Sequence, residues 1–306
     1  MTSKPSASNG RKIAGDWPRS TVLAICALSL ALAFPGAARA QEAAAPASAA
    51  PLGSNLNITP KRLTLARGQR TATAHIFNRG AAPATFEISL VDRVMLESGE
   101  IRAAADSADE AATARLASAR DMIMVSPRRV TLAPGKGQTI RIRVTAPAGV
   151  SAAEYRTHLT VTTLPPPGLG LTAENAAARR AGQLSFHVHS VFGVSIPIIV
   201  RPQAVTAQGE IRNVRLARGG TSPAALMFDL VRTGTGSLFG NVDVRARGKA
   251  RLGGALGLGV YPEIAQRSVS IPLQRVPASG EELEIAFTDD DIKPGRVAAR
   301  TTFRVP

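Results

Sequence analysis

The chain has 306 residues, of which 44% are hydrophobic and 4% aromatic, and 37 Lys and Arg against 22 Asp and Glu give a net charge of +15. This length suffices for two domains of ordinary size, each with its own core. The basic charge suggests nucleic-acid binding, but aromatic residues are scarce and most arginines occur singly in strand-like runs. The composition therefore disfavours a nucleic-acid partner and indicates a solvated basic surface.

The N-terminus has the organisation of a secretory signal peptide. A basic leader precedes an apolar run at 21–34, and Ala38-Arg39-Ala40 supplies the small residues of a cleavage site. The run is shorter than the ~20 residues of a membrane span, so an uncleaved anchor is the less favoured alternative. We predict that residues 1–40 are removed on export. The mature chain then has no cysteine, because Cys26 lies in the leader, and no stable membrane insertion.

Residues 41–54 are rich in Ala, Pro and Ser and are predicted to be a flexible linker. Beyond them, apolar and polar residues alternate with a period of two, and turns with Gly or Pro separate the runs. The first alternating apolar residues are Phe86, Ile88 and Leu90, then Ile140, Ile142 and Val144, then Leu159 and Val161. Strands without helix-period stretches between most of them predict a β-sandwich over residues 55–201.

Residues 103–120 interrupt this pattern with an alanine-rich, charged sequence. A short helix and a mobile loop are both compatible with it. A tolerated insertion on the surface is the favoured interpretation.

The longest alternating run lies at 183–202. Its even-numbered residues from Leu184 to Val200 are apolar except for Ser190. A strand of this length would span roughly 55 Å at ~3.3 Å per residue, whereas a usual strand has ~5–6 residues. So long an apolar edge in an exported protein requires something to cover it.

After Arg201-Pro202 the alternation restarts with a different spacing. The alternating apolar residues are Leu226, Phe228 and Leu230, then Val242 and Val244, then Val269, Ile271 and Leu273, then Leu283, Ile285 and Phe287. They predict a second β-sandwich over residues 203–306, of immunoglobulin-like size. The predicted fold class is therefore all-β, with two immunoglobulin-like β-sandwich domains in tandem.

The residue combinations that support catalysis are missing from the sequence. The chain has four histidines and neither a G-x-S-x-G nor an H-E-x-x-H motif, so we expect no enzyme, no catalytic residue and no cofactor. His187 and His189 would point to one face of a strand, as a metal site requires, but no third ligand accompanies them. Two polar residues on a non-core face are favoured, and no metal is predicted. The glycine-rich pieces at 234–240 and 252–259 open no predicted helix and are interpreted as turns and strands.

One motif covers residues 126–141 and reads SP-x-R-x-x-L-x-PG-x-x-Q-x-x-R. Together with the segments before it, from about Asn55, and the apolar strand that ends at Pro202, this motif resembles the PapD-like periplasmic chaperones of pilus assembly. The C-terminal half is similar to that family in size, position and strand pattern. The resemblance implies a periplasmic chaperone in fimbrium biogenesis and cell wall organisation. Its partners would be pilin-like or other β-rich secreted subunits and an outer-membrane assembly platform.

In that family the last strand of the N-terminal sandwich is lent to an incomplete subunit by donor-strand complementation, which covers the apolar edge. The resemblance implies client binding through Leu184, Phe186, Val188, Phe192, Val194 and Ile196. The part of the run nearest Val200 is expected in the protein's own core.

The resemblance also implies an anchor for the client's C-terminal carboxylate. Arg62 matches the family's arginine, but Pro197 stands where the family has a lysine, and proline carries no charge and no N–H. Lys61 or another nearby base could replace that lysine, or the strand alone could hold the client. A binding or structural module that keeps the fold without the chaperone role is the alternative function.

A third implication of the resemblance is an interdomain salt bridge. Glu154 and Arg201 match two of its members, and Asp290, in the run Asp289–Asp291, is similar in position to the third. An ordinary surface ion pair is the alternative.

Overall fold

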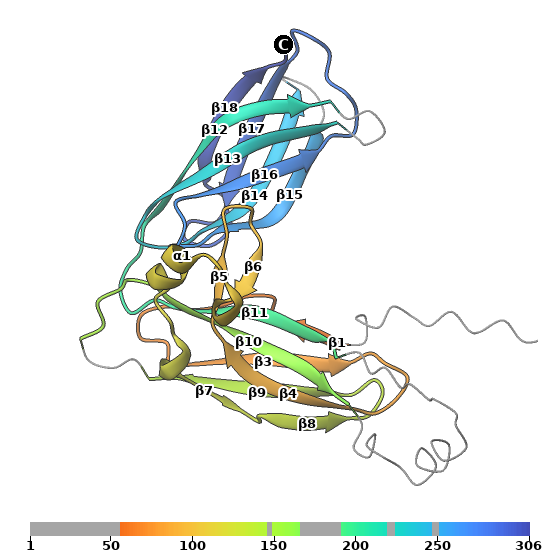
Figure 1. The fold of residues 1–306 in the computed structure, drawn as a ribbon, viewed down its shortest axis with the longest axis vertical. Helices are drawn as coiled ribbons and strands as arrows, with labels where there is room; N and C mark the ends of the chain where they lie inside the picture. The colour runs from red at the N-terminus through yellow and green to blue at the C-terminus, as the bar shows by residue number, and fades with distance from the viewer. Residues whose placement is uncertain (1–55, 146–148, 166–190, 219–223, 247–250) are drawn as a thin grey trace, which may run out of the picture. The chain divides into compact units, whose positions relative to one another are not determined.

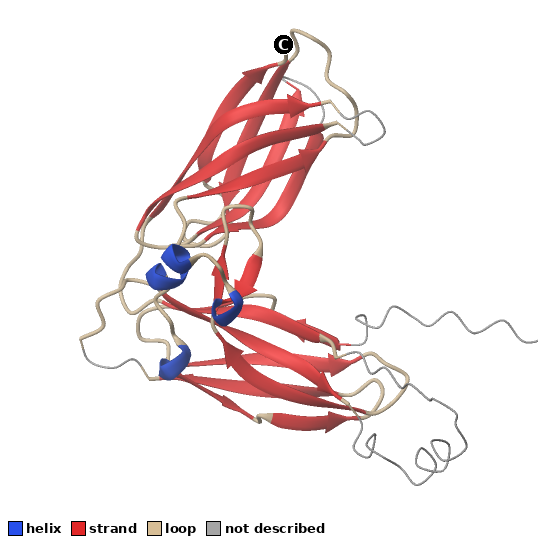
Figure 2. Ribbon diagram, viewed as in Figure 1, coloured by secondary structure: helices blue, strands red, loops and turns tan. Residues whose placement is uncertain are grey.

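The computed structural model describes residues 56–145, 149–165, 191–218, 224–246 and 251–306, which form two β-sandwiches (Figure 1). Figure 2 shows strands throughout both sandwiches and only short helical pieces in the connections. The predicted all-β class is confirmed. Within these ranges, no helix combines the length and hydropathy of a membrane-spanning segment.

The N-terminal sandwich packs a four-stranded sheet against a five-stranded sheet (Figure 1). Its strands are β1 (Leu56–Thr59), β2 (Leu63–Leu65), β3 (Thr71–Asn78), β4 (Ala84–Val91), β7 (Ile123–Ser126), β8 (Arg129–Leu132), β9 (Gly137–Val144), β10 (Tyr155–Leu164) and β11 (Gly193–Val200). The strand order is β1-β3-β9-β7 in one sheet and β2-β11-β10-β4-β8 in the other. β2 runs parallel to β11, and the other neighbouring strands of this sandwich are antiparallel.

The core of this sandwich follows from the period of two. Along β9, buried Ile140, Ile142 and Val144 alternate with exposed Arg141 and Arg143. The apolar residues predicted for β4 and β10 behave similarly: Phe86, Ile88, Leu159 and Val161 are at most 2% exposed and belong to the same cluster. The alternation in the sequence therefore assigned these side chains to the correct face.

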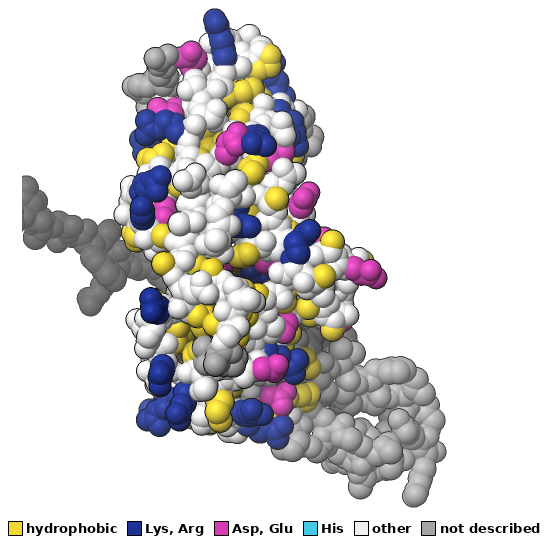
Figure 3. Space-filling view, turned by 90° about the vertical axis from the view of Figure 1, so that its left-hand side faces the viewer, with side chains coloured by type: hydrophobic (Ala, Val, Ile, Leu, Met, Phe, Trp, Pro, Cys, Tyr) yellow, Lys and Arg dark blue, Asp and Glu magenta, His cyan; other side chains and the backbone are white. Residues whose placement is uncertain are grey.

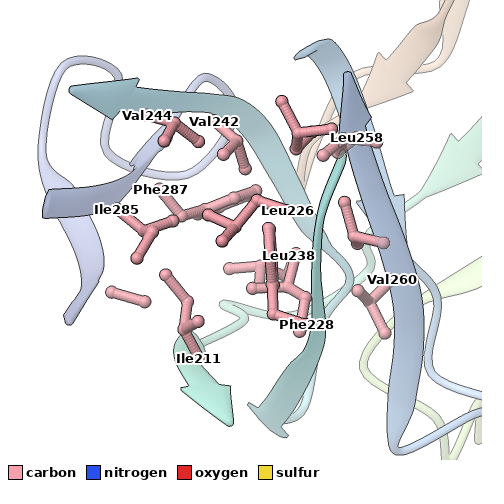
Figure 4. Packing of buried hydrophobic residues seen from close by; sticks show 14 of the residues in the cluster. Ile211, Leu226, Phe228, Leu238, Val242, Val244, Leu258, Val260, Ile285 and Phe287 are labelled. Atoms are coloured by element: carbon pink, nitrogen blue, oxygen red, sulfur yellow. The ribbon is translucent and has the colours of Figure 1, made fainter. Parts of the chain in front are cut away.

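The C-terminal sandwich has a three-stranded and a four-stranded sheet. Its strands are β12 (Ala207–Ala217), β13 (Ala225–Gly234), β14 (Leu238–Ala246), β15 (Arg251–Val260), β16 (Gln266–Pro272), β17 (Glu282–Asp289) and β18 (Val297–Arg304). The order is β12-β13-β16 in one sheet and β15-β14-β17-β18 in the other. Figure 4 shows Leu226 and Phe228 of β13 facing Val242, Ile285 and Phe287 of the opposite sheet. The predicted boundary near Arg201 falls between β11 and β12.

The connection between β4 and β7 is more ordered than the sequence indicated. It contains the hairpin strands β5 (Arg93–Met95) and β6 (Ile101–Ala103), the helix α1 (Glu110–Arg115) and the 3-10 turns η1 (Ala104–Asp106) and η2 (Arg120–Met122). Asp109 caps α1, because its side chain accepts the N–H of Ala112 at 2.8 Å.

This connection is also packed. Ala112 and Ala119 are fully buried, and the N–H of Arg156 in β10 donates to the carbonyl of Ala117 at 2.8 Å. Of the two alternatives for residues 103–120, the short helix is confirmed at Glu110–Arg115, and two backbone hydrogen bonds tie the segment to β10.

The predicted long strand at 184–200 is described only from residue 191. Phe192 precedes β11, which begins at Gly193. The predicted client-binding residues Leu184, Phe186 and Val188, and the two histidines His187 and His189, lie outside the described residues.

Charged side chains are dispersed over the surface that Figure 3 displays. Lys and Arg occur along both sandwiches on this face, with Asp and Glu between them. Such mixing is typical of a solvated basic surface.

Candidate functional site

One edge of β11 is open over its first half. β10 pairs with β11 from Gly193 to Val200 on one side. On the other side β2 is only three residues long, and it reaches no further than Ile198. Among the described residues, no strand pairs with that side of β11 from Gly193 to Pro197.

The direction of the peptide groups on this edge follows from two hydrogen bonds. The N–H of Arg201 donates to Leu65 of β2 at 2.9 Å, and the carbonyl of Phe192 accepts the N–H of Thr163 from the β10 side at 2.8 Å. Because peptide groups alternate along a strand, those of odd-numbered residues point to the β2 side. Gly193 and Ser195 therefore present N–H and C=O groups at the open edge, whereas Pro197 presents only a carbonyl.

The side chains of β11 divide between two cores. Ile196, Ile198 and Val200 are at most 4% exposed and lie in the N-terminal core, whereas Ile199 points the other way and belongs to the C-terminal cluster. The prediction that the Ile196 side chain binds a client is corrected, because this side chain is 2% exposed and fills the protein's own core.

The side chains before Ile196 are less enclosed. Val194 is partly buried against the N-terminal core, Phe192 is also partly buried, and Val191 is 54% exposed. On the opposite face of the strand, the hydroxyls of Ser195 and Thr160 lie 2.6 Å apart. The open edge thus begins with apolar side chains that its own sandwich covers only in part.

Arg62 lies between β1 and β2 and is already paired. Its Nη2 donates to Asp291 Oδ2 at 2.6 Å and to Ser237 Oγ at 3.3 Å, and its guanidinium stacks over Phe239 at 4.3 Å from the ring centroid. Burial lowers the pKa of Arg62 although the charge of Asp291 acts to raise it. Asp291 therefore already fills one side of this guanidinium, and binding of a client carboxylate by Arg62 stays a prediction.

Two other features complete the surroundings of Arg62. Its Nη1 is buried and has no hydrogen-bond partner among the described residues. The neighbouring Lys61 is exposed, and its Nζ donates to Asn57 Oδ1 at 2.7 Å. Lys61 is thus held on the surface just after β1 by its hydrogen bond to Asn57.

Arg201 and Glu154 form the pair that the resemblance implied. Arg201 Nε donates to Glu154 Oε2 at 2.9 Å, and both terminal nitrogens donate to Asp291, at 3.1 and 2.5 Å. Burial acts to lower the pKa of Arg201, but the hydrogen bonds of Asp291 and the charge of Glu154 raise it overall. The side chains of all three residues are at most 9% exposed, so this is no ordinary surface pair.

The third member is Asp291 and not the predicted Asp290. Asp289 accepts the N–H groups of Asp291, Ile292 and Lys293 at 2.7–3.2 Å and so closes a turn after β17. Within this turn Asp290 is exposed, whereas Asp291 faces Arg62 and Arg201. The hydrogen bonds of Asp289 within this turn decide which of the three adjacent carboxylates reaches the arginines.

A second buried ion pair was missed by the sequence analysis. Arg156 of β10 donates from both terminal nitrogens to the carboxylate of Glu263, in the β15–β16 connection, and the two side chains are 2% and 1% exposed. The guanidinium carbon of Arg156 also lies 3.6 Å from the centroid of the Tyr261 ring. Burial raises the pKa of Tyr261. The only sequence feature that pointed to this pair is Arg156 itself, a charged residue in the otherwise uncharged strand β10.

Glu263 also accepts hydrogen bonds from the connection between β4 and β7. Its Oε1 accepts the N–H of Met95 at 2.9 Å, and its backbone carbonyl accepts Arg115 Nε of α1 at 2.8 Å. Three segments from the N-terminal half of the chain therefore converge on one carboxylate-bearing residue of the C-terminal half.

His158 lies two residues after Arg156 on the same face of β10. It is 2% exposed, and neither ring nitrogen has a hydrogen-bond partner among the described residues. Burial, with the charges of Arg156 and Arg93, lowers its pKa to about 3. The group is therefore neutral at physiological pH.

Metal binding finds no support in the described part of the chain, where no cluster of three or more His, Cys, Asp or Glu side chains is arranged to hold an ion.

Among the known proteins compared with this chain, only solved structures match it. No family model and no curated protein matches the chain. The chain is similar to the E. coli chaperone DraB, with 15% identity over 82% of this chain and 96% of that one and a TM-score of 0.42. It is also similar to the periplasmic chaperone SfaE, with 12% identity over 82% and 100% of the two chains and a TM-score of 0.40.

A third similar structure is a pre-assembly complex of the chaperone CsuC with the tip subunit CsuE, from the Csu pili of Acinetobacter baumannii. The identity is 15% over 82% of this chain and 97% of that one, with a TM-score of 0.41. Each of these three solved structures contains a chaperone.

Proposed function

We propose that the chain is a periplasmic chaperone that caps and delivers pilin-like or other β-rich surface subunits through the open edge of β11. The observation that carries the proposal is that Gly193 and Ser195 point peptide groups away from β10, toward a side of β11 that no described strand covers. An extended client segment that pairs there continues the five-stranded sheet, as in β-strand addition.

Apolar side chains at the start of the edge support the same role. Val194 and Phe192 are only partly buried, and Val191 is 54% exposed. Full burial of such a side chain contributes about 1.5–3 kcal/mol, before the cost of ordering the client. A client with an open apolar groove would cover them as the donated strand fills the groove.

The client is held mainly by the strand in this proposal. Arg62 has one unpartnered nitrogen, but its charge is shared with Asp291, and Pro197 supplies no second cation. The leader supports export to the periplasm, and an outer-membrane platform is the proposed acceptor of the client. Client folding drives the transfer, so no nucleotide or cofactor takes part.

The Ser195→Pro substitution tests the proposal, with Ser195→Ala as the matched control. Both variants lose the hydroxyl that contacts Thr160, but only proline removes the N–H at the open edge. We expect Ser195→Pro to lower the recovery of a co-expressed pilin-like subunit that lacks one strand by about tenfold, because a client carbonyl stays unpaired. Ser195→Ala should retain most of the recovery.

The measurement is the amount of subunit that copurifies with each tagged variant from the periplasm, with thermal unfolding of each free variant as the check on folding. Equal recovery with the two variants would contradict strand addition at this edge.

The alternative function is a module that keeps the fold without the chaperone role. It is favoured by one observation, the internal pairing of Arg62 with Asp291. In that case the wild-type protein recovers no subunit at all, whereas the chaperone proposal requires a stoichiometric complex.

A further inference from the structure

A cavity opens at one end of the N-terminal sandwich, between the ends of its two sheets. Its volume is about 330 Å³, and its lining comes from the β2–β3 turn at 66–70, the end of β9 at 143–145 and the end of β11 at 200–202. Val144 and Val200 belong to the core and give the cavity an apolar floor. The volume lies at the lower end of the range for small-molecule sites.

The rim of this cavity is basic. Arg67, Arg70 and Arg143 are exposed residues of its lining, and none of the described residues that line it carries a carboxylate. None of the three forms an ion pair with a residue that the structure describes, whereas other exposed arginines do, such as Arg102 with Glu100 and Arg275 with Glu281. The three arginines, which we call the rim arginines, therefore keep their positive charge uncompensated around one hollow.

Arg201 also lines the cavity but adds little to this charge. Its nitrogens already donate to Glu154 and Asp291, as described above. The positive potential of the cavity thus comes from the rim arginines.

The turn that carries two of the rim arginines is held closed. The N–H of Gln69 donates to the carbonyl of Ala66 at 3.0 Å, and the side-chain carbonyl of Gln69 accepts the N–H of Ala66 at 2.8 Å. Gly68 has a φ of +87°, which side-chain-bearing residues rarely adopt. In addition, the carbonyl of Arg70 accepts the N–H of Val144 at 2.8 Å, which joins the turn to β9. The backbone that bears the rim arginines is therefore ordered before any ligand arrives.

From these observations we infer that the cavity is a binding site for a phosphate group. Guanidinium groups match the geometry of phosphate and carboxylate oxygens. Three uncompensated positive charges favour a phosphate dianion over a single carboxylate, because the attraction scales with the charge of the ligand. The apolar floor accommodates the group that carries the phosphate. This site is separate from the open edge of β11 and does not depend on the proposed function.

The test uses the purified protein and isothermal titration with inorganic phosphate, together with sedimentation of the protein with vesicles that contain an anionic phospholipid. The variants are Arg70→Gln and Arg143→Gln. The matched control is Arg79→Gln, which removes the same charge from an exposed arginine just beyond the opposite end of β3.

Saturable phosphate binding that weakens about tenfold or more in each rim variant, and is unchanged in Arg79→Gln, would support the site with free phosphate as its ligand. Binding of the vesicles alone, with the same dependence on the rim arginines, would support it with a lipid headgroup as the source. In both cases added salt should weaken binding. Absence of saturable binding to either probe, or equal weakening by Arg79→Gln, would overturn the inference.

Discussion

Replacing Glu263 by Gln is expected to lower the free energy of unfolding by about 3–5 kcal/mol, the usual cost of removing one partner of a buried ion pair. The amide keeps the shape of the side chain and can still accept the N–H of Met95. It removes the charge that faces Arg156, whose side chain is 2% exposed and cannot turn to water. Denaturant unfolding, followed at pH 7, measures the change.

The matched control is Glu100→Gln, the same substitution in a pair with Arg102 whose side chains are 51% and 47% exposed. Exposed pairs contribute little to stability because water screens their charges, so this variant should unfold nearly as the wild type does. A double variant, Arg156→Met with Glu263→Leu, should recover much of the loss, because no buried charge is left. If Glu263→Gln and Glu100→Gln lowered the free energy of unfolding by similar amounts, the buried pair would not be a main source of stability.

The second large effect is a loss of stability in acid that depends on His158. Burial, with the charges of Arg156 and Arg93, lowers the pKa of this histidine from 6.5 to about 3. Below about pH 6.5 the unfolded chain therefore takes up a proton that the folded chain refuses, and stability falls until the pH reaches the folded-state pKa. At about pH 4.5 this difference amounts to about 2–3 kcal/mol.

The measurement compares the free energy of unfolding at about pH 7 and pH 4.5 in the wild type and in His158→Leu. Leucine fills a similar volume between Val91 of β4 and Pro197 of β11, the residues that flank His158 in the sheet, and it has no proton to bind. The free energy of unfolding should fall less on acidification in His158→Leu than in the wild type, by about 2–3 kcal/mol. His75→Leu, on the exposed face of β3, is the matched control, and a similar change there would contradict the assignment to His158.

The sequence allowed the fold to be predicted because the period of two is a local property. Phe86, Ile140 and Phe287 each fall in a run whose apolar residues share one face, and all three are at most 1% exposed. The same period could not locate the end of the protein's own core along β11. The protein's own core extends along β11 to Ile196, which is 2% exposed. The open edge begins where β2 ends, because β2 has only three residues and leaves the peptide groups of Ser195 unpaired on that side.

The ion pairs were less accessible to prediction. Asp289, Asp290 and Asp291 are equivalent in sequence, and only the turn closed by Asp289 gives Asp291 to the arginines. Arg156 and Glu263 are 107 residues apart, and no spacing rule joins a strand residue to a loop residue of another sandwich. The resemblance identified Arg62, but it contained no information on the internal carboxylate that now occupies it.

Pro197 has a consequence for solubility. An uncovered strand invites the same strand of a neighbouring copy, and proteins limit this hazard by breaking the row of donors with proline. Here the break falls between the last residue covered by β2 and the stretch at Gly193–Ser195. Two copies that met along the described part of this edge would find only a short ladder to share, which limits polymerisation through β11.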